Sequence, residues 1–119
     1  MNKQAEQTLD KAHAVNIHQD SEELLRQRYM EMVSDTLPNM SKSRDWPIRF
    51  DHCFARVILD QVFQGCWYDH IDRKKGAAYK QLNSAQLLDA LTIAGRILQG
   101  PDEVLVDMNK QSLRWRGKL

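Results

Sequence analysis

Residues 21–38 show the first helical pattern in the chain. Ser21 precedes Glu22 and Glu23, which is typical of a helix start, because a serine hydroxyl caps free N–H groups and acids are favoured at the positive end of the helix dipole. Larger side chains then recur at helical spacing: Leu25, Tyr29, Met32, Val33 and Thr36. We expect Pro38 to end this helix, since proline lacks the N–H that continues the hydrogen-bond ladder.

The clearest two-faced pattern covers residues 46–65. Trp46 and Pro47 are expected to open a helix, with Pro47 in the first turn, where its missing N–H costs nothing. One face carries an apolar stripe: Phe50, Phe54, Val57, Ile58 and Val62. The other face carries a polar ridge: Arg49, His52, Arg56 and Asp60. We expect the helix to end near Gln64, with Gly65 as the residue after the cap.

Two further helices are predicted in the last third of the chain. Asn83 and Ser84 are competing N-caps for the first, whose apolar residues continue to Leu98. Gly100 ends that helix, and Pro101 is expected at the first position of the next. The last helix has four residues that can face a core: Val104, Leu105, Met108 and Trp115.

The fold class follows from these patterns. No segment alternates strictly between apolar and polar residues beside turn signals, so we predict an all-α protein, a small bundle of about four main helices. Residues 1–20 carry few large apolar side chains, and we expect a flexible N-terminal arm or a frayed helix there. Residues 21–119 then form a single helical domain. The apolar sides of so thin a layer are compatible with a homodimer.

Composition narrows the function classes only slightly. The 119 residues and 42% hydrophobic content suit one domain with one core. A net charge of +1 argues against bulk nucleic-acid coating and a polybasic membrane anchor. No run approaches the roughly 18 apolar residues of a membrane span, and the first residues lack the apolar run of a secretion signal. Two cysteines, Cys53 and Cys66, suggest free thiols in a reducing cytoplasm rather than a disulfide scaffold.

Residues 66–81 combine aromatic and ionisable side chains just after a predicted helix end. We expect short helical turns here, with a break at Gly76. Four consecutive residues form the most site-like run: Trp67, Tyr68, Asp69 and His70. Such a loop can line a pocket with aromatic walls and a few oriented polar groups, and Asp69 or Asp72 could orient His70 as a base. In the alternative interpretation, Trp67 and Tyr68 fill the core.

The polar ridge of residues 46–65 is a second candidate. Arg49 and Arg56 could bind an anion while His52 carries a proton. The alternative is a solvated helix face on which Arg56 pairs with Asp60, one turn further along.

Two matches to known site types carry little weight. The set His52, Cys53, Cys66 and His70 has zinc-ligand chemistry, but neighbours on a helix point about 100° apart, so no metal site is expected. Residues 73–78 match the coenzyme A loop of GNAT acetyltransferases. That loop follows a strand, and no strand is predicted here, so we interpret the match as coincidence.

Basic residues surround an aromatic side chain near the C-terminus: Arg114, Trp115, Arg116 and Lys118. Such a set can bind phosphates and stack on a base, which makes nucleic-acid binding an alternative function. The same cations are also favoured at the C-terminal end of a helix by its dipole.

Three stretches resemble a group of small uncharacterised bacterial proteins: RFDHCF (49–54), CWYDHIDR (66–73) and SLRWRGK (112–118). The likeness covers residues 45–119, and some members of the group carry a loose acetyltransferase label. The group brings no established activity. The resemblance implies that nine side chains belong to one constellation: Arg49, Asp51, His52, Trp67, Tyr68, Asp69, His70, Arg114 and Trp115.

We therefore expect a small cytoplasmic binding or regulatory protein that uses a polar-aromatic pocket or surface. Its predicted ligand-binding residues are Arg49, His52, Arg56, Trp67, Tyr68, Asp69 and His70. The expected partner is an anionic small molecule or another protein, with no cofactor, metal or membrane. Two alternatives stay open: a small acetyltransferase-like transferase with His70 or His52 as base, and nucleic-acid binding through the C-terminal basic helix.

Overall fold

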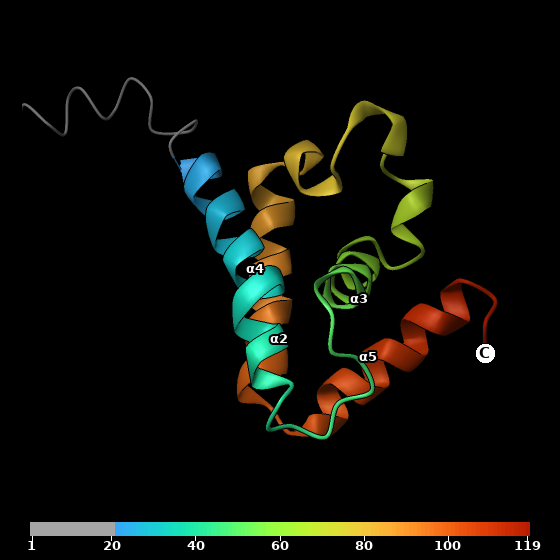
Figure 1. Cartoon of the computed structure of the whole chain (residues 1–119). Coiled ribbons are helices and arrows are strands. Elements are labelled where there is room, and N and C mark those ends of the chain that lie inside the picture. Colours follow the sequence, from blue (N-terminus) through green and yellow to red (C-terminus); the bar gives the residue numbers. More distant parts are fainter. Residues whose placement is uncertain (1–20) are drawn as a thin grey trace, which may run out of the picture.

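A computed structural model describes residues 21–119, and these residues form a small all-α bundle (Figure 1). The main helices are residues 21–40, α3 (Asp51–Phe63), α4 (Ser84–Gln99) and α5 (Asp102–Trp115). No strand occurs between residues 21 and 119, which confirms the predicted fold class. Within the same range, no helix has both the length and the apolar character that crossing a membrane requires. The predicted N-terminal arm, residues 1–20, lies outside the described residues.

The first helix continues through Pro38, so the prediction that this proline ends it is wrong. A π-helical turn, η1 (Met32–Thr36), comes first, and α2 (Leu37–Met40) follows. The N–H of Leu37 already bonds to the carbonyl oxygen of Met32, five residues back. Pro38 therefore falls in the first turn of a new α-helical segment, where its missing N–H is tolerated.

The central helix is α3, which contacts η1, α4 and α5. In Figure 1 it is seen nearly end-on between the other helices. Its fully buried apolar residues are Phe54, Val57, Ile58 and Leu59. The first three belong to the predicted apolar stripe, and all four pack into one core with buried residues of the neighbouring helices.

The predicted start of α3 is wrong by about one turn. The helix begins at Asp51, and Phe50 is its N-cap with an extended backbone (φ −105°, ψ 153°). Because the chain is not yet helical at Phe50, that side chain leaves the stripe and is 65% exposed. Trp46 lies in the preceding loop and is buried edge-on against Phe54, with 5.7 Å between ring centroids.

Arg44 joins the loop before α3 to the corner between α4 and α5. Its guanidinium donates to the carbonyl oxygens of Leu98 and Gly100, at 3.2 and 2.7 Å, and to the carboxylate of Asp102 at 2.5 Å. These bonds satisfy oxygens that the end of α4 leaves unpaired. The hydrogen bond from Arg44 also holds the pKa of Asp102 below its ordinary value. A polar contact therefore holds this corner in addition to apolar packing.

The remaining helix ends follow local chemistry. Asn83 caps α4 in a reciprocal capping box with Gln86, each of the two bonds being 2.9 Å long. At the end of α3 the left-handed residue is Gln64 (φ 53°), one position before the glycine that was predicted to follow the cap. Pro101 stands just before α5 rather than at its first position.

Three short 3₁₀ turns connect α3 to α4, as the sequence predicts. They are η2 (Trp67–Asp69), η3 (Arg73–Lys75) and η4 (Ala78–Gln81). Gly76 separates η3 from η4 with a φ of 118°, a conformation that favours glycine. Figure 1 shows this segment at the end of the bundle opposite the α4–α5 corner. Its position closes one side of the pocket described below.

Two glycines, one inside α4 and one at its C-cap, should respond in opposite ways to substitution by alanine. A Cβ atom at Gly100 would lie 2.6 Å from the carbonyl oxygen of Arg96 and 2.9 Å from Cγ2 of Val104. One at Gly95, inside α4, would meet nothing within 4 Å. We expect Gly100→Ala to lower the free energy of unfolding by about 1–3 kcal/mol and Gly95→Ala to raise it by about 0.5–1 kcal/mol. Urea denaturation measures both, and equal effects would contradict the close approach at Gly100.

Candidate functional site

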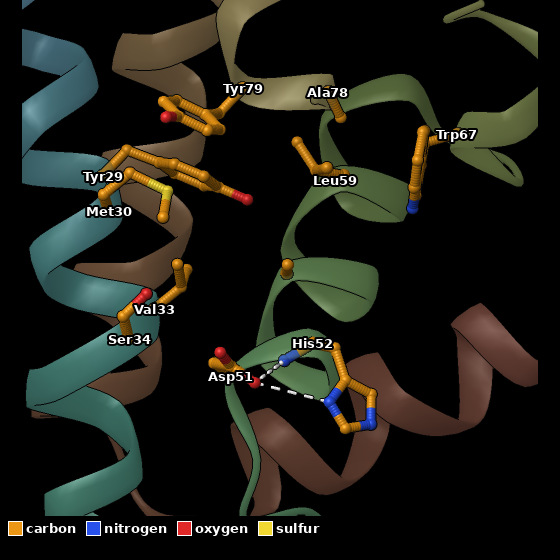
Figure 2. A pocket seen from close by; sticks show the side chains of 11 residues that line it. Tyr29, Met30, Val33, Ser34, Asp51, His52, Leu59, Trp67, Ala78 and Tyr79 are labelled. Carbon is orange, nitrogen blue, oxygen red and sulfur yellow. Dashed lines mark hydrogen bonds and ion pairs between the residues drawn. The ribbon is translucent and has the colours of Figure 1, made fainter. Parts of the chain in front are cut away.

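A pocket of about 240 Å³ lies between the first helix, α3 and the segment that carries η2 and η4 (Figure 2). Its residues come from three separate parts of the chain, so the pocket forms only when these parts pack together. Five small or apolar side chains contribute to the lining: Met30, Val33, Ala55, Leu59 and Ala78. Val33 and the neighbouring Ser34 come from the π-helical turn η1, and such turns occur frequently at functional sites.

The upper end of the pocket in Figure 2 is aromatic. Tyr29 and Tyr79 stack with 6.5 Å between ring centroids and 23° between ring planes. Trp67 stands across the pocket from them, on η2. The backbone N–H of Trp67 donates to the carboxylate of Asp60 at 2.9 Å, which fixes the start of η2.

The hydroxyl group of Tyr29 is a buried polar group without a partner in the described part of the chain. The side chain is only 2% exposed, and its Oη has no hydrogen-bond partner among residues 21–119. Figure 2 shows this hydroxyl pointing away from the first helix, toward Leu59 on α3. Burial raises the pKa of Tyr29 above its ordinary value, so the proton stays on the oxygen. An unpaired buried hydroxyl costs about 1–3 kcal/mol and calls for an explanation.

The opposite end of the pocket is polar and open to solvent. Asp51 is the first residue of α3, and its Oδ1 accepts a 2.7 Å bond from the backbone N–H of His52. Nδ1 of His52 lies 3.4 Å from the same oxygen, and the imidazole stacks on Phe50. The side chains of His52 and Asp51 are 77% and 63% exposed, respectively, so water competes with their contact. His52, one of the two histidines that the enzymatic alternative uses as a base, thus contacts a carboxylate, but neither side chain is shielded from water.

Asp60 is fully buried, so its assignment to an exposed polar ridge is wrong. Its carboxylate accepts two bonds from Arg116, at 2.7 and 3.0 Å, one from the Ser112 hydroxyl at 2.6 Å, and the bond from Trp67. The hydrogen bonds to Asp60 raise the pKa of Arg116, whose side chain is 11% exposed. We call Asp60, Ser112, Arg116 and the Trp67 N–H the Asp60 network. It joins α3, α5 and η2.

The expected pair between Arg56 and Asp60 does not form in the part of the chain that the structure describes. Arg56 instead donates to the Ser112 hydroxyl and to Oδ1 of Asn109, both at 2.7 Å. The pKa of Arg56 lies below its ordinary value, mainly because burial removes water from the guanidinium. Arg49, the other predicted anion-binding arginine, donates to the carbonyl oxygen of Ser41 at 2.8 Å. The two arginines and His52 thus have different partners, and no described pocket has all three in its lining.

The side chains of the predicted run, residues 67–70, contact different neighbours and do not gather around one site. Tyr68 lies beneath two guanidinium groups, Arg73 at 3.7 Å and Arg116 at 4.6 Å from its ring centroid. His70 stacks on Phe63 with 4.9 Å between centroids, and Asp69 is exposed. Of the seven predicted ligand-binding residues, only His52 and Trp67 line the pocket.

The C-terminal basic set is also divided. Arg116 is held by the Asp60 network, while Arg114 and Lys118 are exposed and Trp115 is half-buried. Among residues 21–119, no group of three or more His, Cys, Asp or Glu side chains is placed to hold a metal ion. Cys53 and Cys66 are free thiols.

Sequence reasoning missed Tyr29 and Tyr79 as pocket residues. A signal for Tyr29 existed, because a tyrosine in an apolar helix stripe must bury a hydroxyl that needs a partner. Spacing along a helix does not show whether a distant segment supplies that partner. Tyr79 lies in a segment without helical periodicity and gave no such signal.

Comparison of the chain with protein-family models, with curated proteins and with solved structures finds no match in any of the three. The function is therefore argued from the pocket alone.

The Asp60 network predicts a large loss of stability when its charge is removed. Asp60→Asn leaves the guanidinium of Arg116 nearly buried without its counter-ion, so we expect the free energy of unfolding to fall by about 3 kcal/mol. Asp69→Asn is the matched control, because Asp69 is exposed, and should change stability by less than about 0.5 kcal/mol. Urea denaturation measures both variants. A small effect at Asp60 would contradict the network.

The buried hydroxyl of Tyr29 predicts a specific loss of stability in alkali. Its pKa in the folded protein lies above the ordinary value of 10.0, so above that pH the unfolded chain binds fewer protons than the folded one and stability falls as pH rises. Between about pH 10 and about pH 11, titration of this group should lower the free energy of unfolding by up to about 1.4 kcal/mol. Tyr29→Phe should lack that share, measured by urea denaturation across this range. Parallel pH profiles of the two proteins would contradict it.

Proposed function

We propose that the protein is a binding protein for a small, mainly apolar molecule, held in the pocket between the first helix, α3 and η4. The observation that carries this proposal is the lining itself. Its eleven residues include two tyrosines and one tryptophan but no lysine or arginine. The polar end of the pocket, at its mouth, consists of Asp51 and His52. An apolar concavity with a few polar groups at one end is typical of small-molecule sites.

The volume of the pocket sets the size of the ligand. An engineered cavity of roughly 150 Å³ holds benzene, so about 240 Å³ has room for about ten non-hydrogen atoms. A helix or an extended peptide needs a longer groove, which favours a small molecule over a protein partner. Dissociation constants between about 1 mM and about 1 µM correspond to about 0.4–0.8 kcal/mol for each of ten atoms, within the range that ligands of this size reach.

The charge of the lining favours a neutral or cationic ligand over the anion expected from the sequence. Asp51 is the only carboxylate among the lining residues within 21–119. Arg49 and Arg56, which were expected to meet an anion, bond to Ser41 and to α5 instead. A ligand carboxylate would therefore lose its hydration without gaining a lysine or arginine partner among the lining residues.

Indane, a bicyclic hydrocarbon of about the right size, is a suitable probe. Ala55 lies on α3 and lines the pocket, so Ala55→Leu should fill part of the volume and weaken indane binding at least about tenfold, which is about 1.4 kcal/mol. Ala85→Leu makes the same change at an exposed position of α4 and should bind indane like the wild type. Chemical shifts of backbone amides and of the Trp67 indole N–H report binding.

Circular dichroism of the two leucine variants checks that both remain helical. If the wild type shows no binding of indane, or if Ala55→Leu binds it as well as Ala85→Leu does, the proposal is wrong.

A further inference from the structure

We infer that the Tyr29 hydroxyl is the specificity group of this pocket and that the ligand is a compact ring compound presenting a neutral hydrogen-bond acceptor, such as a carbonyl oxygen, to it. This inference rests on the proposed function, because it requires a molecule in the pocket. It adds the chemical class of that molecule, which the size and polarity of the pocket leave open.

The Tyr29 hydroxyl is in an unusual state for a polar group in a protein core. Tyr29 is almost completely buried, its Oη has no partner among the described residues, and Figure 2 shows the O–H end of the ring directed toward the pocket-lining residues of α3. Phenylalanine would fill the same space without leaving a polar atom unpaired. The Oη atom has almost no accessible surface in the structure, so a ligand acceptor reaches it only when a neighbouring side chain of the lining moves aside. The acceptor would then complete a hydrogen bond that residues 21–119 do not supply.

The chemistry of the Tyr29 hydroxyl determines which kind of partner it needs. Burial keeps the Tyr29 proton on its oxygen, so the group is available as a donor. A phenolic O–H donates more strongly than it accepts, because the ring withdraws electron density from the oxygen. Its pocket neighbours Met30, Val33 and Leu59 have no side-chain nitrogen or oxygen that could accept this bond. The missing partner is therefore an acceptor.

The lining of the pocket determines the charge and shape of the ligand that carries the acceptor. Of the eleven lining residues that the structure describes, Asp51 alone carries ionised oxygen atoms and none is lysine or arginine. A carboxylate would therefore lose its hydration in an apolar site without such a cationic partner. A neutral carbonyl oxygen avoids that cost. The stacked rings of Tyr29 and Tyr79 and the ring of Trp67 across the pocket offer flat apolar contact area to a cyclic body.

The experiment compares two probes of the same shape in two proteins. Indane and 1-indanone differ by one carbonyl group, and Tyr29→Phe differs from the wild type by one hydroxyl. We expect Tyr29→Phe to bind indane at least as well as the wild type does and 1-indanone about tenfold more weakly. The carbonyl infrared band of bound 1-indanone should lie at lower wavenumber in the wild type than in Tyr29→Phe, because only the wild type donates to it.

The outcomes separate the two proposals. If neither probe binds the wild type, the pocket proposal fails and this inference with it. If both probes bind and Tyr29→Phe weakens them equally or not at all, the pocket remains but the role of Tyr29 is refuted. If indane-1-carboxylate binds more tightly than 1-indanone, the acceptor is an anion and the neutral class is wrong. Tyr29→Phe should unfold at the same or a higher urea concentration than the wild type, so weaker binding does not reflect a loss of folding.

Discussion

The buried carboxylate of Asp60 is the interaction on which the arrangement of the helices around the pocket depends. A charge with no exposure to water is tolerated only where hydrogen bonds replace its hydration, and here Arg116, Ser112 and the Trp67 N–H supply them. Those donors come from α5 and η2, so burying Asp60 requires both elements to pack against the end of α3. Because Trp67 is held at its backbone by this network, one wall of the pocket is fixed by a contact that lies outside the pocket.

The first helix contributes the other wall, and its local irregularity bears on the pocket. The π-helical turn η1 precedes Pro38 and carries Val33 and Ser34, both of which line the cavity. A residue inserted into the helical repeat changes which side chains face the neighbouring helix. The turn that allows proline inside the first helix thus also determines which residues this helix presents to the pocket.

The sequence predicted the helices well because their signal is local. Spacing of three and four residues, the capping box at Asn83 and the short turns between α3 and α4 each depend on residues close together in the chain. The burial of Asp60 depends on donors 52 and 56 positions further along the chain, and the spacing within one helix carries no information about them. The same reason applies to the candidate site. His52 and Trp67 were predicted as ligand-binding residues from their side-chain chemistry, whereas Tyr29 was identified only as one of the side chains at helical spacing. That spacing cannot show whether the Tyr29 hydroxyl has a partner.

Two polar groups in one small core are treated in opposite ways. Asp60 carries a charge and has every bond that its burial demands, whereas the Tyr29 hydroxyl is buried with none from residues 21–119. Nε of Arg26 and Nε1 of Trp46 are also buried without a partner from residues 21–119, but of these three groups only Tyr29 lines the pocket. A phenylalanine at position 29 would give a more stable fold, because it keeps the stack on Tyr79 and leaves no polar atom unpaired. An unpaired donor beside an apolar cavity is therefore better explained by a molecule that enters the cavity than by the stability of the empty fold.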